Sequence, residues 1–274
     1  MAQNFAHGNY SHTQKKARNS GGGGRTPRDR ARLTLSQNLL ADTHAIDLVI
    51  NAARPHGLVL EPGAGEGALT TALATMAGVE VVGYENDPLL AAKLRARTGL
   101  KIVKGDLTAA APPQEPFAVV GNTPYSITSQ IVDWCLRAPA MTSATLLTPL
   151  AYAREHSGDL GLWSLVTVES WPWFHWELLG RVGRESFRPA SPADSGILRI
   201  ERRPEPLIDA GGTWRELVEL GFTGVGGSLS ASLKTRHQGV DDALARAGVE
   251  RDAAVGHVHP DQWITIYREI HHDL

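Results

Sequence analysis

Short apolar runs alternate with stretches of helical spacing through the first part of the chain. The apolar runs predict buried strands at residues 58–60, 79–84, 101–103, 117–120 and 144–147. Apolar side chains recur at the spacing of a helix over residues 45–53, 69–76, 88–97 and 127–136. Strands and helices that alternate in this way predict an α/β fold with a Rossmann-like, mostly parallel, doubly wound sheet and right-handed crossovers.

This alternation ends near residue 180. A Pro-rich loop at 187–192 precedes an expected strand at 196–200, and helical spacing follows at 214–222, 241–247 and 261–270. Four aromatic residues precede the change, and we expect them in the core or at a subdomain seam: Trp171, Trp173, Phe174 and Trp176. The pattern predicts a main domain at residues 34–200 and a small helical C-terminal domain at 201–274.

The N-terminal stretch is basic and almost free of apolar residues. Residues 1–36 hold seven basic side chains against one acid, Asp29, and Gly21–Gly24 forms a flexible run. Because so little is available to bury, we expect residues 1–33 to form a disordered arm. Arginines next to the folded boundary favour contacts with nucleic-acid phosphates, and the alternative is a solvated tail without a function. These candidate RNA-binding residues are Arg25, Arg28, Arg30 and Arg32.

Composition narrows the class of protein. The chain has one cysteine, Cys135, which excludes an internal disulfide and a cysteine-rich zinc site. The eleven histidines show no ligand spacing with an acid, so we expect no metal. We find neither an apolar run long enough to span a membrane nor the apolar region of a signal peptide, and we therefore expect a cytoplasmic protein.

A Gly-rich turn, Glu61–Gly67, joins the strand at 58–60 to the next helix. Such a unit brings a ligand close to the backbone of Gly63 and Gly65 and to a helix N-terminus. The turn matches the G-x-G-x-x-A fingerprint, so an NAD-dependent dehydrogenase is one interpretation. However, Glu61 and Glu66 flank the turn, and acids suit a ligand with a positive centre, such as a sulfonium, better than a pyrophosphate.

Polar side chains follow three further strands. Glu85 lies about 20 residues beyond the turn, where a carboxylate can bind the hydroxyls of a ribose. Asp106 follows the strand at 101–103 and can accept from an adenine amino group. Asn122 follows the strand at 117–120, where it can contact the reacting groups. This ordered set favours S-adenosylmethionine over NAD.

Residues 121–125, Gly-Asn-Thr-Pro-Tyr, offer an acceptor beside a stacking surface. Gly121 allows close backbone approach, and Pro124 fixes the turn. Asn122 has an amide oxygen that can hold an exocyclic amino group, and the ring of Tyr125 can stack on a planar base. The alternative is an ordinary turn that ends a strand and carries an incidental tyrosine.

Together these residues resemble the rRNA adenine N6-methyltransferases, and the Erm branch most closely. The resemblance rests on Gln37-Asn38, the Gly-rich turn, Glu85, Asp106, the segment at 121–125 and a further match at 185–189. It implies transfer of methyl groups from S-adenosylmethionine to an adenine of 23S rRNA, giving macrolide-lincosamide-streptogramin B resistance. We also expect a monomer that acts on 23S rRNA before full ribosome assembly, with a C-terminal domain that contributes to rRNA binding.

The resemblance further implies roles for individual residues. Cofactor contacts would fall on Asn38, Leu40, Gly63, Gly65, Glu85, Asp106 and Asn122. Catalytic contacts to the target base would fall on Asn122, Tyr125 and Phe187. The small-subunit dimethyladenosine transferases share most of these motifs, but they usually carry Leu where Thr123 stands and have a longer C-terminal domain. They are therefore the alternative, and a non-catalytic RNA-binding relative is another.

Overall fold

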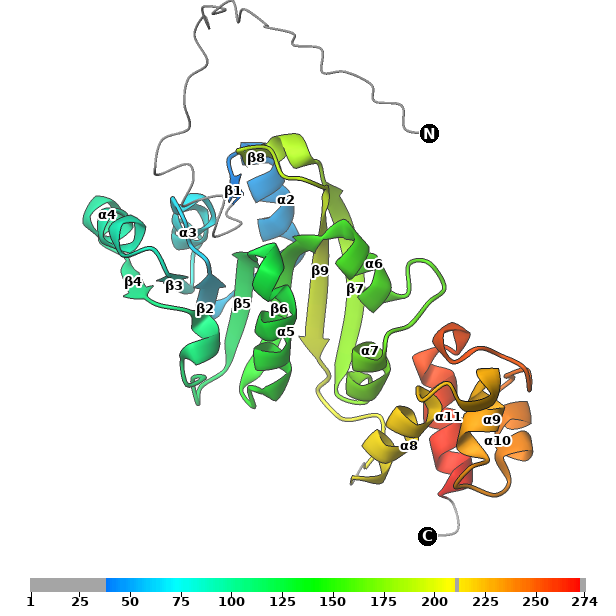
Figure 1. Ribbon diagram of the computed structural model, residues 1–274. Coiled ribbons are helices and arrows are strands. Elements are labelled where there is room, and N and C mark those ends of the chain that lie inside the picture. The colour runs from blue at the N-terminus through cyan, green and yellow to red at the C-terminus, as the bar shows by residue number, and fades with distance from the viewer. Residues whose placement is uncertain (1–37, 210–211, 272–274) are drawn as a thin grey trace, which may run out of the picture. The chain divides into compact units, whose positions relative to one another are not determined.

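The computed structural model describes residues 38–209 and 212–271, which contain a central seven-stranded sheet in the order β4-β3-β2-β5-β6-β9-β7 (Figure 1). The strands of this sheet are β2 (Gly57–Pro62), β3 (Val79–Glu85), β4 (Lys101–Lys104), β5 (Phe117–Asn122), β6 (Met141–Pro149), β7 (Phe174–Val182) and β9 (Ser195–Arg202). A second, two-stranded sheet pairs β1 (Leu39–Leu40) with β8 (Phe187–Arg188).

The five strands from β4 to β6 are parallel, and β9 and β7 extend the sheet antiparallel to their neighbours. This arrangement confirms the prediction of a mostly parallel sheet. The chain moves outward from β2 to β3 and β4, and then returns to place β5 on the other side of β2. The carboxyl ends of β2 and β5 therefore form a topological switch point, where open α/β sheets bind their ligands.

Helices cover both faces of the sheet. Helices α2 (Thr43–Ala53) and α3 (Ala68–Ala74) pack on one face, and α5 (Thr128–Arg137) packs on the other. Neighbouring residues of one strand divide between the two cores: Val59 joins the cluster with α2, and Leu60 joins the cluster with α5. Because both faces are buried, these strands are continuous apolar runs, which explains why the sequence pattern revealed them.

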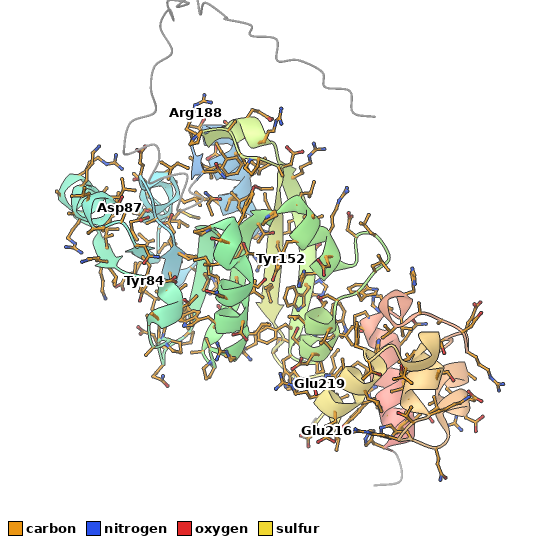
Figure 2. The ribbon with its side chains drawn as sticks, viewed as in Figure 1. Tyr84, Asp87, Tyr152, Arg188, Glu216 and Glu219 are labelled. Carbon is orange, nitrogen blue, oxygen red and sulfur yellow. The ribbon has the colours of Figure 1, made fainter. Side chains whose placement is uncertain are left out.

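Helix α4 (Pro88–Thr98) packs against the edge strand β4 through Leu94 and Ile102. Its N-cap is Asp87, which accepts a hydrogen bond from Leu89 N at 2.8 Å, and Figure 2 shows this side chain at the start of the helix. Pro88 at the first helical position and a left-handed glycine at the C-cap complete the usual signals of helix ends.

The sequence pattern did not predict strand β7 or the two helices that precede it, α6 (Leu150–Ser157) and α7 (Leu165–Ser170). In β7 the side chains alternate, with Phe174 and Trp176 buried and His175 and Glu177 exposed. The aromatic cluster therefore lies in the core, as expected, but as part of a strand. Trp176 Nε1 donates to Ser170 Oγ at 3.0 Å, so this strand is also tied to α7.

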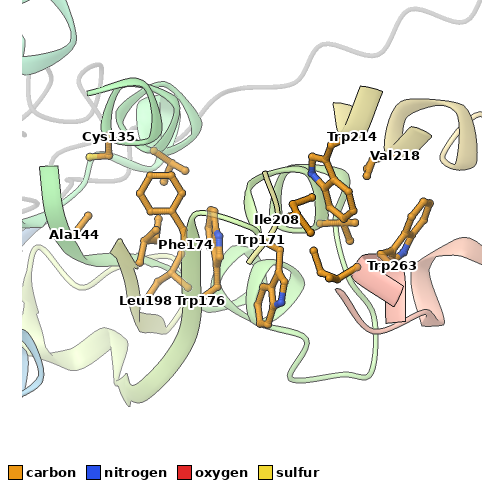
Figure 3. Packing of buried hydrophobic residues seen from close by; sticks show 14 of the residues in the cluster. Cys135, Ala144, Trp171, Phe174, Trp176, Leu198, Ile208, Trp214, Val218 and Trp263 are labelled. Carbon is orange, nitrogen blue, oxygen red and sulfur yellow. The ribbon is translucent and has the colours of Figure 1, made fainter. Parts of the chain in front are cut away.

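The C-terminal part is helical, as predicted. Its helices are α8 (Thr213–Gly221), α9 (Leu229–Leu233), α10 (Val240–Arg246) and α11 (Pro260–Ile270). Trp214 and Trp263 are fully buried in a hydrophobic cluster that also contains Trp171 (Figure 3). The expected boundary at 200/201 falls inside β9, so a separate domain stays a prediction. No helix in the described ranges has the length and apolar composition to cross a membrane.

Candidate active site

A cleft opens at the carboxyl ends of β2 and β5, at the switch point of the sheet. It is lined by Asn38, Leu39, Gly63, Gly65, Asn122, Thr123, Pro124 and Tyr125. The structure thus brings together four of the predicted cofactor residues and two of the predicted catalytic residues, from segments that lie far apart in the sequence.

The Gly-rich turn forms one wall of this cleft and requires its glycines. Gly63 and Gly65 have φ values of 66° and 57°, which side chains rarely adopt. A Cβ on Gly65 would lie 2.7 Å from Leu39 Cδ2, and a Cβ on Gly63 would lie 3.5 Å from Pro124 Cδ. The absence of side chains therefore lets the turn approach both β1 and the segment after β5.

Gly121 has a comparable role beneath the cleft. A Cβ at this position would lie 2.7 Å from Pro62 Cδ and 3.1 Å from the Pro62 carbonyl oxygen. The two central strands can therefore approach closely at their carboxyl ends, as the sequence analysis expected of this glycine.

The side chain of Asn122 is held in one orientation. Its Nδ2 donates to the Asn38 carbonyl oxygen at 2.7 Å, which assigns the amide nitrogen to that side and leaves Oδ1 as the acceptor on the other. The next residue is anchored as well, because Thr123 Oγ1 donates to the Leu147 carbonyl oxygen at 2.8 Å. The hydrogen-bond acceptor Asn122 Oδ1 therefore projects from an anchored end of β5.

Glu85 and Asp106 lie at the neighbouring strand ends, but neither lines the cleft. The Glu85 carboxylate is 1% exposed and accepts from Gly65 N at 2.7 Å and Asp87 N at 2.8 Å. It therefore ties the Gly-rich turn to β3. Asp106 is half-buried and caps a short 3-10 helix by accepting from Thr108 N at 2.9 Å. The predicted ribose and adenine contacts of these two acids stay predictions.

Tyr125 is anchored by residues that the sequence analysis missed. Its hydroxyl lies 2.9 Å from Ser191 Oγ and 2.8 Å from Ser195 Oγ, and both serines are buried. These partners are 66 and 70 residues away in the chain, so no local pattern marks them. Because the hydroxyl is engaged, the ring face is the part of Tyr125 that remains for a ligand.

Phe187 and Leu40 do not line the cleft. Their side chains are 1% and 6% exposed, and they pack with Val182 and Ile197 in the hydrophobic cluster under α2. Leu40 pairs with Phe187 across the β1–β8 sheet, and it is Leu39 that lines the cleft. In this conformation the Phe187 ring does not reach a base in the cleft, so its stacking role stays a prediction.

The arginines of the N-terminal arm lie outside the described residues, and their contact with RNA stays a prediction. This applies to Arg25, Arg28, Arg30 and Arg32.

Comparison with known proteins decides the family. The family model of the ribosomal RNA adenine dimethylases matches residues 28–272 of this chain. The chain belongs to the ribosomal RNA adenine dimethylase family.

Two known proteins are similar to this chain over more than three quarters of their own length. The chain is 50% identical over 253 residues to an rRNA adenine N-6-methyltransferase of Streptomyces fradiae, covering 88% of this chain and 79% of the relative. It is 36% identical over 258 residues to the mycinamicin-resistance protein MyrB of Micromonospora griseorubida, covering 89% and 80%. Among solved structures, that of the 23S rRNA methyltransferase ErmE matches with a TM-score of 0.81 and 44% identity, covering 85% of this chain and all but 1% of that one.

The cofactor of the ribosomal RNA adenine dimethylases is S-adenosylmethionine, and the cleft of this family member fits it. The turn presents backbone atoms of Gly63 and Gly65 to the cleft, while Pro124 and Leu39 occupy the spaces beside these glycines, and the Glu85 carboxylate lies against the turn at the Gly65 amide. Among the residues that the structure describes, no group of histidine, cysteine and acidic side chains is placed to hold a metal ion.

Glu61 is an unusual residue in this dimethylase core. It is 2% exposed, and its Oε2 has no hydrogen-bond partner in the described part of the chain. Burial raises the pKa of Glu61 to about 8, with a contribution from nearby Thr70 that lowers it and a smaller one from the Glu85 carboxylate that raises it. A carboxyl with this pKa is mostly protonated at pH 7, so Glu61 does not supply the negative charge expected beside the turn from the sequence. A buried acid with a perturbed pKa beside a ligand cleft is typical of a functional site.

Proposed function

We propose that this chain transfers methyl groups from S-adenosylmethionine to the N6 amine of a specific adenine in 23S rRNA. The observation that carries the proposal is the fixed amide of Asn122, whose nitrogen donates to Asn38 and whose oxygen is therefore the acceptor left for an amine. The 44% identity to a 23S rRNA methyltransferase supports the choice of the large-subunit RNA over the small-subunit alternative.

The chemistry needs little more than positioning. The lone pair of an adenine N6 is delocalised into the ring, so the free amine is a poor nucleophile. Asn122 Oδ1 accepts one N–H bond of the amine and thereby aims its nitrogen at the methyl group. We assign the second N–H bond to the Thr123 carbonyl, because the Pro124 carbonyl already accepts from Ile127 N and Thr128 Oγ1.

The target base must leave its stack to enter the cleft. The ring of Tyr125 then stacks on the base, and its hydroxyl stays bound to Ser191 and Ser195. The methyl group passes from the sulfonium sulfur to N6 by in-line displacement, as the C–S bond breaks and the C–N bond forms. The alkylated nitrogen carries a positive charge and is acidic, so it loses a proton to solvent. A second round with fresh cofactor gives dimethyladenine.

We further propose that this modification confers macrolide-lincosamide-streptogramin B resistance, as the likeness to a mycinamicin-resistance protein supports. The enzyme acts as a cytoplasmic monomer on rRNA that is not yet fully assembled into ribosomes. Its basic N-terminal arm and its C-terminal helices add to the affinity for RNA.

The test is to incubate the full chain with methyl-labelled cofactor and with 23S or 16S rRNA transcripts, and then to map the labelled base. We expect dimethyladenine at one position of the 23S transcript and none in the 16S transcript. Labelling of the 16S transcript alone would replace the proposal with the small-subunit alternative.

Two asparagine variants locate the chemistry. Asn122→Ala is expected to lower the rate of transfer by roughly 100-fold or more at an unchanged fold, because a contact that orients the nucleophile is lost. Asn51→Ala, an exposed asparagine on α2, is the matched control and should keep full activity. Near-normal turnover of Asn122→Ala would contradict the assigned role.

A further inference from the structure

We propose that the substrate RNA extends past the cleft and lays its phosphate backbone on a basic surface formed by Lys93 and Arg97 of α4 and Lys104 of β4. We call these three residues the α4 surface. The proposal rests on the proposed function, since it takes rRNA as the substrate, and it adds a binding site outside the methyl-transfer cleft.

The charge of the chain is unevenly distributed around this surface. Residues 88–104 contain five basic side chains and no acid. They are Lys93, Arg95, Arg97, Lys101 and Lys104. The net charge is −2, and residues 1–36 already hold seven basic side chains against one acid, so the folded part is more acidic than the net charge indicates. An acidic body that binds RNA needs local clusters of cations.

The cations of the α4 surface are available for a ligand. Lys93, Arg97 and Lys104 are exposed, and none forms an ion pair with a carboxylate of the described residues. The guanidinium of Arg97 donates to the Glu66 carbonyl oxygen, which is a neutral partner. None of the three charged groups is therefore held in a salt bridge within the described ranges, and Glu66 is the acid that shares a cavity with Lys93 and Arg97.

A second basic region lies in a groove that contains Arg154, Arg181 and Arg184, and two of these three arginines form ion pairs with acids. Arg154 forms an ion pair with Asp159 at 2.9 Å, and Arg181 forms one with Asp194. A phosphate that binds there must compete with these carboxylates. This comparison favours the α4 surface for phosphate binding.

The α4 surface adjoins the cleft. A small cavity lined in part by Gly65, Glu66, Lys93 and Arg97 lies behind the Gly-rich turn, and Gly65 also lines the cleft itself. Lys104 ends β4 in register with Glu85, at the same edge of the sheet. When the target base of the RNA occupies the cleft, the phosphates that neighbour this base can therefore contact Lys93, Arg97 and Lys104 beyond the Gly-rich turn.

Two structural roles apply to Arg95, Arg97 and Lys101, so these three cations are weaker evidence for an RNA site. Arg95 and Arg97 lie in the last turn of α4, where they complement the helix dipole. Lys101 lies on the edge strand, where a charge discourages pairing with a second chain. Neither role requires Lys93, which lies in the middle of α4. A loss of RNA affinity on changing Lys93 would therefore report the proposed contact and not a structural role.

The experiment measures binding of the full chain to a 23S rRNA transcript over a series of salt concentrations, together with methyl transfer. The variants are Lys93→Ala, Lys104→Ala and their combination. Lys101→Ala is the matched control, because it removes an exposed lysine from the opposite end of β4. Arg97 is left intact, since its guanidinium also holds the turn.

We expect each single variant to bind RNA roughly three- to tenfold more weakly at about 0.1 M salt and to lower the slope of log K against log salt by about one, and the combination to lower it by about two. The affinity for S-adenosylmethionine should not change, and Lys101→Ala should match the wild type. Equal binding by Lys93→Ala and Lys101→Ala would overturn the proposal. If the wild type binds the transcript but does not methylate it, the proposed function fails, while the binding comparison still decides the surface.

Discussion

The two walls of the cleft are built in different ways. The wall proposed to bind the cofactor, which we call the cofactor wall, is one strand–turn–helix unit with Gly63 and Gly65 in the turn after β2. The Glu85 carboxylate accepts a hydrogen bond from the Gly65 amide and supports this turn. The base wall combines distant segments, because Tyr125 is held by Ser191 and by Ser195 at the start of β9, a strand separated from β5 by β6. The comparison shows that the cofactor half depends on backbone geometry, whereas the base half depends on tertiary contacts between side chains.

The largest effect is expected from Glu85→Ala. This change leaves the Gly65 and Asp87 amides without their buried acceptor, so the Gly-rich turn loses its attachment to β3. We expect a loss of roughly 100-fold or more in affinity for S-adenosylmethionine, measured by calorimetry. Asp133→Ala, which removes an exposed acid of α5, is the control and should bind normally. Normal cofactor binding by Glu85→Ala would show that the cofactor wall does not need this support.

Gly121→Ala tests whether the close approach of β5 to β2 holds the two walls together. The added Cβ would lie 2.7 Å from Pro62 Cδ and 3.1 Å from the Pro62 carbonyl oxygen, so the strands must move apart. We expect a loss of about 2–3 kcal/mol in the free energy of unfolding by urea, because overpacking is costly in a buried sheet. Gly212→Ala, where no atom lies within 4 Å of the added Cβ, should unfold like the wild type.

Glu61→Gln tests the buried acid beneath the cofactor wall. Since its pKa rises from 4.5 to about 8 on folding, the stability of the wild type falls as the pH increases through that range. Glutamine cannot ionise, so the variant should be more stable than the wild type by ~1–3 kcal/mol at pH 8 and by much less at pH 5. Urea unfolding at the two pH values measures this difference. If the difference in the free energy of unfolding between variant and wild type were the same at pH 5 and pH 8, the pKa of Glu61 would not be raised.

The smallest effect is expected from the serines of the base wall. The double variant Ser191→Ala/Ser195→Ala frees the Tyr125 hydroxyl, so the ring is less well oriented. We expect roughly a five- to tenfold rise in the KM for RNA with little change in the KM for the cofactor, in line with about 1 kcal/mol for lost neutral hydrogen bonds. Tyr125→Phe should give the same change, and adding the serine changes to Tyr125→Phe should have no further effect. Additive losses would show that the serines act independently of Tyr125.

Those parts of the fold and the site that depend on neighbouring residues were predictable from local patterns. Strands buried on both faces are continuous apolar runs, so β2 to β6 were visible, and the glycines and polar residues at their ends marked the switch point. Strand β7 was missed because its buried positions Phe174 and Trp176 belong to a dense group of aromatic residues, and such a group is equally compatible with a packed cluster outside a strand.

Which side chains face the cleft depends on how the assembled strands and helices pack together. Phe187 is buried against α2 and Tyr125 is pinned by two serines, although the local sequence of each is equally compatible with the opposite arrangement. The burial of Glu61, and with it the raised pKa, also depends on the helices that fold over the sheet. Periodicity reports which face of an element is apolar, but contacts between segments more than 60 residues apart are set by how the whole sheet assembles, and no local pattern contains them.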